Sequence, residues 1–272
     1  MLARRALFSL ATSEAFEWAV GRVPGARERA WRSARRYVAG EAPDDALQVA
    51  RALGARGLLA SIDLFGERVT DPQVVRSVAD AYVALAGRLP EGACLSIDLS
   101  HVAFDAGVLR RIAAVARVQV GAEAAAVTDR VLDAVLAVGG ERVDATLQAN
   151  LPRSAADAAR LAAARVPVRL VKGAYVEPGA LPWGPETDAA YARLALELRD
   201  AGAEVRLATH DEALLRRVLP ELPGADCELL LGMRPDLAAR LRASGRRVRV
   251  YVPYGPNWFR YFMRRRAEAQ GH

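Results

Sequence analysis

The sequence predicts an α/β fold, a (β/α)8 barrel of the TIM type with an N-terminal helical extension. Its 272 residues are an ordinary length for one such barrel. Eight short strand-like segments recur along the chain, and several carry apolar residues on both alternations, as parallel strands covered on both faces do. Amphipathic stretches of helical length separate most of these segments, and this alternation favours a barrel.

The strand-like segments follow one another from residue 58 to residue 252. We expect strands at residues 58–64, 93–99, 116–121, 142–149, 166–172, 204–210, 227–231 and 247–252. The third unit has the weakest pattern, because the linker after Leu99 is short and the strand carries Gln119. We place an N-terminal helical segment at residues 1–40, with an amphipathic helix over 3–20, and the (β/α)8 barrel domain at residues 41–272.

Capping residues predict where the helices begin. Asp71 followed by Pro72 predicts a start, because Asp caps helices and Pro suits the first helical position. Ser154 with Asp157 three residues later predicts a variant of the capping box. We expect the other helices at residues 186–200, closed by Gly202, after Asp211, from Pro235, and over 257–269.

Composition excludes several classes of protein. The net charge of +6 comes from arginines spread along the whole chain, and no zinc-finger, homeodomain or RNP-like signature occurs, so we expect no nucleic-acid partner. No apolar run reaches the roughly 18 residues that span a bilayer. Cys94 and Cys227 lie in strand-like runs and are expected to be buried thiols, which suggests a reducing compartment, the cytoplasm.

Familiar cofactor and metal motifs are also missing from the sequence. There is no glycine-rich dinucleotide or nucleoside-triphosphate loop and no Gly-x-Ser-x-Gly nucleophile motif. His210 shows no metal-ligand spacing with His101 or His272, so we expect no metal site. A single histidine such as His210 is more often a packed or surface residue.

Polar residues gather where the predicted strands end, and barrel enzymes carry their active sites at these carboxyl ends. The residues at the ends are Asp63, Asp98, Gly121, Gln148, Lys172, His210, Gly232 and Tyr251. We therefore expect the functional site on this rim of the barrel.

Two cations close the fifth predicted strand. Lys172 is the single lysine of an arginine-rich chain, and Arg169 precedes it in the same strand. Gly173 follows, so the backbone can twist and let both cations reach the mouth of the barrel. Such a pair suits an anionic or electron-rich cofactor. The alternative is two surface cations at a strand end.

The last predicted helix presents a basic face. Tyr261, Arg264, Arg265 and Glu268 are spaced so that they share one side of the helix. Two adjacent guanidiniums can bind a small carboxylate bidentately. The alternatives are a solvated basic face or a helix that contacts phosphates.

Several segments together resemble the bacterial single-function proline dehydrogenases. The specific ones are Arg-Leu-Val-Lys-Gly-Ala-Tyr at 169–175, Ala-Thr-His-Asp at 208–211, Val-Arg-Val-Tyr-Val-Pro-Tyr-Gly at 248–255 and Tyr-Phe-Met-Arg-Arg-Arg-Ala-Glu at 261–268. Asp-Leu-Phe-Gly-Glu at 63–67, Leu-Gln-Ala at 147–149 and Arg-Tyr-Val-Ala-Gly-Glu at 36–41 fit the same family. The resemblance runs in order from about residue 36 to residue 268.

The resemblance implies a distorted (βα)8 barrel that holds FAD and oxidises L-proline to 1-pyrroline-5-carboxylate. A quinone is the implied electron acceptor, reached at a membrane surface by peripheral contact. The implied substrate residues are the carboxylate clamp of Arg264 and Arg265, paired with Glu67, and the tyrosines Tyr251 and Tyr261 over the ring. Arg169 is expected near the flavin N5, and the other implied cofactor residues are Gln148, Lys172, Gly173, Ala174, Thr209, His210 and Glu268.

The sequence departs from the family at two positions that matter for the site. Asp98 stands where the family carries a lysine, and Gly121 stands where it carries an aspartate. Smaller departures are Ala124, Asn150 and Leu231. One hypothesis is that Asp98 now faces the substrate amine, with an altered substrate. The other is a non-catalytic relative that binds flavin or an amino acid.

Overall fold

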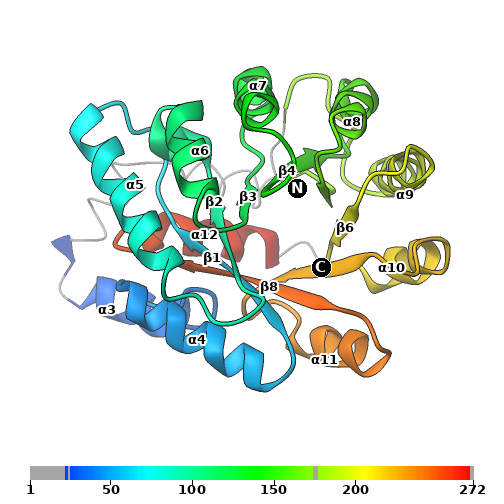
Figure 1. The fold of residues 1–272 in the computed structure, drawn as a ribbon. Coiled ribbons are helices and arrows are strands. Elements are labelled where there is room, and N and C mark those ends of the chain that lie inside the picture. The colour runs from blue at the N-terminus through cyan, green and yellow to red at the C-terminus, as the bar shows by residue number, and fades with distance from the viewer. Residues whose placement is uncertain (1–21, 24, 174–176, 270–272) are drawn as a thin grey trace.

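The structure, a computed structural model, describes residues 22, 23, 25–173 and 177–269, with side chains up to residue 266. Eight parallel strands form a closed barrel in which each strand pairs with its neighbours in the sequence, and β1 pairs with β8 (Figure 1). The strands are β1 (Leu59–Leu64), β2 (Cys94–Ile97), β3 (Val118–Val120), β4 (Val143–Gln148), β5 (Val168–Val171), β6 (Val205–Ala208), β7 (Asp226–Leu230) and β8 (Val248–Tyr254). The predicted fold class is confirmed.

The described helices surround the barrel (Figure 1). They are α3 (Ala26–Ala34), α4 (Pro43–Ala55), α5 (Pro72–Ala86), α6 (Ala106–Ala113), α7 (Thr128–Val138), α8 (Ser154–Ala163), α9 (Pro185–Asp200), α10 (Glu212–Val218), α11 (Pro235–Ala243) and α12 (Trp258–Ala269), with short 3-10 turns η1 (Leu99–Val102), η2 (Ala125–Val127) and η3 (Leu219–Glu221). None of these helices is long and apolar enough to cross a membrane. The helix expected over residues 3–20 lies outside the described residues.

Strand boundaries agree with the apolar pattern at all eight positions. No boundary differs from the expected one by more than two residues, and β8 continues two residues past its predicted end because Pro253 and Tyr254 still pair with Asp63 and Leu64 of β1. β3 is only three residues long, in line with its weak pattern.

Two of the predicted helix caps are present, and one is wrong. Asp71 accepts a hydrogen bond from the Gln73 amide at 2.7 Å, and Asp211 accepts one from the Leu214 amide at 3.0 Å. Ser154 is not a cap, because the preceding Arg153 is already helical and the Ser154 hydroxyl donates to the carbonyl of Gln148 instead. The hydroxyl therefore ties the start of α8 to the end of β4.

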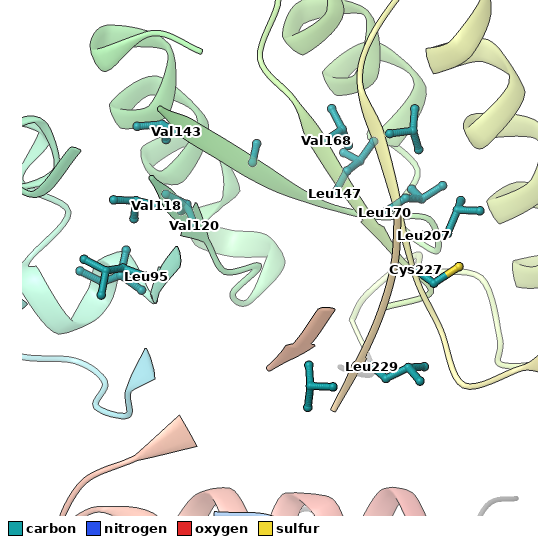
Figure 2. Packing of buried hydrophobic residues seen from close by; sticks show 14 of the residues in the cluster. Leu95, Val118, Val120, Val143, Leu147, Val168, Leu170, Leu207, Cys227 and Leu229 are labelled. Atoms are coloured by element: carbon teal, nitrogen blue, oxygen red, sulfur yellow. The ribbon is translucent and has the colours of Figure 1, made fainter. Parts of the chain in front are cut away.

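The apolar core fills the layer between the strands and the surrounding helices. Figure 2 shows part of it, with Val168 and Leu170 of β5 close to Leu207 of β6 and Cys227 of β7. Cys94 and Cys227 are free, buried thiols, as expected. On β5 these apolar residues alternate with Arg169, which consequently points into the barrel.

The interior of the barrel is unusually polar for this fold, in which bulky apolar side chains commonly fill the centre. Asp144 of β4 pairs with the buried Arg206 of β6 and with Arg117, whose Nη1 lies 2.6 Å away. Above them, Glu228 of β7 lies 2.8 Å from Arg169. Buried charges are costly unless they are paired, and these interior charges are paired across the barrel.

An aromatic cluster joins α3 to α12. Trp31 of α3 packs on Trp258 of α12 with ring centroids 4.8 Å apart, and the Trp258 indole donates to Glu41 at 2.8 Å. Figure 1 shows α12 beside β1 and β8. The basic face predicted for this helix is thereby held over the rim of the barrel.

Candidate active site

The end of β1 supplies a buried carboxylate that orients two tyrosines. Asp63 is 2 % exposed, and its Oδ1 accepts a hydrogen bond from Tyr82 of α5 at 2.8 Å. Its Oδ2 accepts the hydroxyl of Tyr251 from β8. Burial raises the pKa of Asp63 to about 6, although both tyrosine hydroxyls and the charge of Arg169 oppose the shift. Asp63 thus fixes the direction of the Tyr251 hydroxyl.

Residues from β5, β8 and α12 form a continuous cation–aromatic cluster at the rim. The Arg169 guanidinium lies 5.9 Å from the ring centroid of Tyr251. The rings of Tyr251 and Tyr261 are 5.9 Å apart, and the Arg265 guanidinium lies 4.9 Å from the Tyr261 ring. The structure therefore brings together four of the residues that the sequence singled out.

Arg264 joins this cluster to the loop after β1. Its Nη2 lies 2.5 Å from Oε1 of Glu67, and its guanidinium lies 4.9 Å from the ring of Phe65. The residue is 8 % exposed, so the pair is shielded from water. The expected partnership of Glu67 with one clamp arginine is present, and the arginine is Arg264.

Asp98 follows β2 and lies among other acids. Removal from water raises the pKa of its carboxyl well above the usual value, and the charges of Asp63, Glu123 and Glu67 raise it further. The charge of Arg264 lowers it in part, which places Asp98 within electrostatic reach of the clamp. A carboxyl in this setting holds its proton more tightly than an ordinary aspartate.

The single lysine is not part of the cation–aromatic cluster. The Lys172 ammonium lies 2.5 Å from Asp188 of α9 and 2.8 Å from Asp211, the cap of α10. Its charge is therefore balanced by two carboxylates on the α9 and α10 side of the barrel.

Most of the other proposed cofactor residues form local bonds at the ends of β4 and β6. Gln148 donates to the carbonyl of Glu123 at 2.9 Å. The Thr209 hydroxyl accepts the amide of Asp211 at 3.1 Å, and Nε2 of His210 accepts the amide of Leu230 at 3.0 Å. Ala174 and the side chain of Glu268 lie outside the described residues.

Comparison with known proteins decides the family. The family model described as "Proline dehydrogenase" matches residues 46–271. The chain belongs to the proline dehydrogenase family. It is 37% identical over 276 residues to the proline dehydrogenase of Deinococcus radiodurans, covering 89% of this chain and 88% of that protein. It is 31% identical over 260 residues to proline dehydrogenase 1 of Bacillus subtilis strain 168, covering 86% of each.

Solved structures show the same fold. Proline utilization A from Bdellovibrio bacteriovorus, inactivated by N-propargylglycine, matches with a TM-score of 0.79 at 19% identity, over 95% of this chain and 35% of that one. A mutant of proline utilization A from Bradyrhizobium japonicum matches with a TM-score of 0.73 at 23% identity, over 90% and 32%. This proline dehydrogenase family member thus spans about a third of those longer chains.

The end of β4 offers an unsatisfied polar group to the FAD that the sequence resemblance implies. The amide oxygen of Asn150 is buried without a hydrogen-bond partner among the described residues. Next to it, Gly173 has a φ of 114°, and a Cβ there would lie 1.9 Å from that oxygen. A close backbone approach, an unsatisfied amide and the cation of Arg169 together suit a planar polar ring.

Sequence reasoning assigned no role to three residues of this site. Tyr82 comes from a helix outside the barrel, and no local motif marks it. Glu123 bonds to the Ser100 amide at 2.9 Å across two strand ends, and Glu228 contacts Arg169 from two strands away. The one available signal was a charged residue at an interior position of an otherwise apolar strand, which applies to Glu228.

Proposed function

We propose that the chain is an FAD-dependent proline dehydrogenase, which oxidises L-proline or a related cyclic secondary amino acid to the imine, 1-pyrroline-5-carboxylate for proline itself. The observation that carries the proposal is the cluster of Arg264, Arg265, Tyr251 and Tyr261 beside Arg169 at the rim of the barrel. Two guanidiniums beside two aromatic rings match a small ring that bears a carboxylate.

The substrate carboxylate would bind between Arg264 and Arg265. Arg264 already faces Glu67, so the incoming carboxylate must share or displace that partner. The rings of Tyr251 and Tyr261 would cover the apolar part of the substrate and exclude water. Asp63 keeps the Tyr251 hydroxyl turned toward β1, which leaves the face of the ring for packing.

Asp98 would face the substrate amine. Oxidation removes a hydride from the ring carbon next to nitrogen and the proton on nitrogen, and it forms a carbon–nitrogen double bond. The raised pKa of Asp98 brings its proton affinity closer to that of an amine, which favours exchange of that proton with the carboxyl. Because hydride loss needs the free amine, activity should rise with pH until the bound amine is neutral.

The cofactor would lie over β4 to β6. Its proposed contacts are Gln148, Arg169, Lys172, Gly173, Ala174, Thr209, His210 and Glu268. FAD would accept the two electrons that leave the substrate and pass them to a quinone. A cation such as Arg169 near the ring favours its reduced form. The quinone, the contact with a membrane surface and the location in the cytoplasm rest on the sequence alone.

One observation favours a second candidate, a non-catalytic homologue that binds flavin or an amino acid. Asp98 and Gly121 replace the lysine and aspartate of the family, so the acid cluster of Asp98, Asp63 and Glu123 has lost a cation. Such a site would bind an amine without oxidising it.

Spectroscopy of the purified protein separates the two candidates. We expect a yellow protein whose flavin absorbance bleaches when L-proline is added without oxygen. A flavin that stays oxidised with proline and with ring-substituted analogues would overturn the dehydrogenase proposal, and a colourless protein that resists loading with FAD would favour the second candidate. Asp98→Ala should slow the bleaching, and an unchanged rate would exclude Asp98 as the partner of the amine.

A further inference from the structure

Glu228 is a buried carboxylate for which the proposed reaction has no direct use. It lies on β7 and is 2 % exposed. Its Oε1 accepts a hydrogen bond from the Gln119 amide on β3 at 2.6 Å. Its Oε2 lies 2.8 Å from Nε of Arg169 on β5. Three strands therefore meet at this one carboxylate inside the barrel.

The contact between Glu228 and Arg169 is ionic. The Nε hydrogen of Arg169 is not directed at the carboxylate, since neither atom completes a hydrogen bond within the described residues. The side chain of Arg169 is 12 % exposed and that of Glu228 1 %, so water screens the pair little. Two other buried carboxylates lie nearby, and both have partners of their own. Asp144 is bound by Arg206 and Arg117, and Asp63 accepts the hydroxyls of two tyrosines.

Gln119 fixes the position of this negative charge. A carboxylate held at 2.6 Å by a buried amide cannot follow Arg169 if the guanidinium moves. Arg249, whose Nε lies 3.9 Å from Oε1, adds a weaker attraction from β8. Glu228 is thus a counter-ion that Gln119 holds in place, and it contacts Arg169, whose guanidinium reaches the rim of the barrel.

We propose that Glu228 is a positioning residue that acts through Arg169 and lowers the reduction potential of the bound flavin. The inference rests on the proposed function, because it needs FAD at the rim. A cation beside the ring stabilises the reduced, more negative flavin, and a carboxylate in contact with that cation offsets part of its field. Glu228 therefore keeps the flavin from becoming too strong an oxidant to pass its electrons onward.

The test measures the flavin midpoint potential of the holoenzyme and of Glu228→Gln. We expect at least a tenfold shift of the equilibrium toward reduced flavin in Glu228→Gln, which for a two-electron couple is about 30 mV more positive. Glu228→Asp keeps the charge but withdraws it from Arg169, so its potential should lie between those of the two proteins. This second variant also keeps the test decisive if Glu228→Gln fails to fold.

Asp226→Asn is the matched control. Asp226 lies on the same strand, is also buried, and pairs with Arg247 at 2.7 Å, but it lies two residues further from the rim. We expect a much smaller shift from this variant. Unchanged potentials in both Glu228 variants, or an equal shift in Asp226→Asn, would overturn the inference and leave the proposed function standing. A wild-type protein that binds no FAD would overturn both.

Discussion

The carboxylate of Asp98 lies where a side chain at Gly121 would begin. A Cβ placed on Gly121 would fall 1.9 Å from Oδ1 of Asp98, which is far inside contact distance. The Gly121 amide also bonds to the carbonyl of Ile97 at 2.8 Å, so the two strand ends cannot separate easily. Residues 98 and 121 are therefore sterically coupled, and the acid at residue 98 fills the space that an acid at residue 121 would need.

Gly121→Asp should consequently be harmful by itself. We expect a loss of roughly 1–3 kcal/mol in the free energy of unfolding, because the new side chain overlaps Asp98 and adds a carboxylate to an acid cluster. Asp98→Lys combined with Gly121→Asp removes the overlap and pairs the charges, so the double variant should recover most of that loss. Urea unfolding of the two single variants and the double variant measures the coupling. Additive effects would contradict it.

The proposed carboxylate clamp makes a prediction about substrate binding. Arg264→Ala and Arg265→Ala should each raise the KM for proline roughly 10- to 100-fold, since each removes hydrogen bonds to a charged group. Arg266→Ala is the control, because Arg266 follows on the same helix but is exposed and packs near the ring of Phe262. Steady-state kinetics would contradict the clamp if all three variants kept the wild-type KM.

Part of this site could be predicted from local sequence, because spacing along one element fixes which side chains share a face. Tyr261 and Arg265 are one helical turn apart, and they do contact each other. The ends of the strands could be predicted for the same reason, from the residue pattern along each segment. Asp71 and Asp211 also cap their helices as their positions indicate.

The remainder depends on how the strands are staggered around the barrel. Whether Glu228 meets Arg169 depends on the register of β5, β6 and β7, which no local pattern encodes. The overlap between Asp98 and Gly121 likewise depends on the pairing of β2 with β3. Ser154 was misread because its hydroxyl had a better partner in the carbonyl of Gln148 than a helix amide.

Asp63 should make the stability of the protein depend on pH. Its pKa is raised from 3.8 to about 6 in the folded state, so the folded chain binds a proton that the unfolded chain has released between these values. The contribution is fully present below about pH 4 and is lost as the pH rises to about 6. Relative to Asp63→Asn, the wild-type free energy of unfolding should fall by up to roughly 3 kcal/mol over that range.

Urea unfolding at pH 4 and pH 7 measures this difference. Asp105→Asn is a control, since Asp105 caps α6 with hydrogen bonds to Gly107 and Val108 on the surface of the protein. That variant keeps Asp63, so its free energy of unfolding should fall between the two pH values as it does in the wild type. An equal change in the free energy of unfolding of the wild type and of Asp63→Asn between the two pH values would contradict the raised pKa of Asp63.

Lys172 should act mainly through the two carboxylates it bridges. Although burial opposes it, hydrogen bonds from Lys172 and from the Leu214 amide keep the pKa of Asp211 below its usual value. Lys172→Met would leave Asp188 and Asp211 facing each other without a cation, and we expect a loss of about 1–2 kcal/mol in the free energy of unfolding. Arg193→Met, on the exposed face of α9, should cost much less.

FAD titration completes the comparison. Because the Lys172 ammonium is already balanced by two carboxylates, Lys172→Met should weaken FAD binding less than Arg169→Met does. A stability equal to that of Arg193→Met, together with a larger loss of FAD affinity than in Arg169→Met, would show that Lys172 acts mainly on the cofactor and not through the two carboxylates.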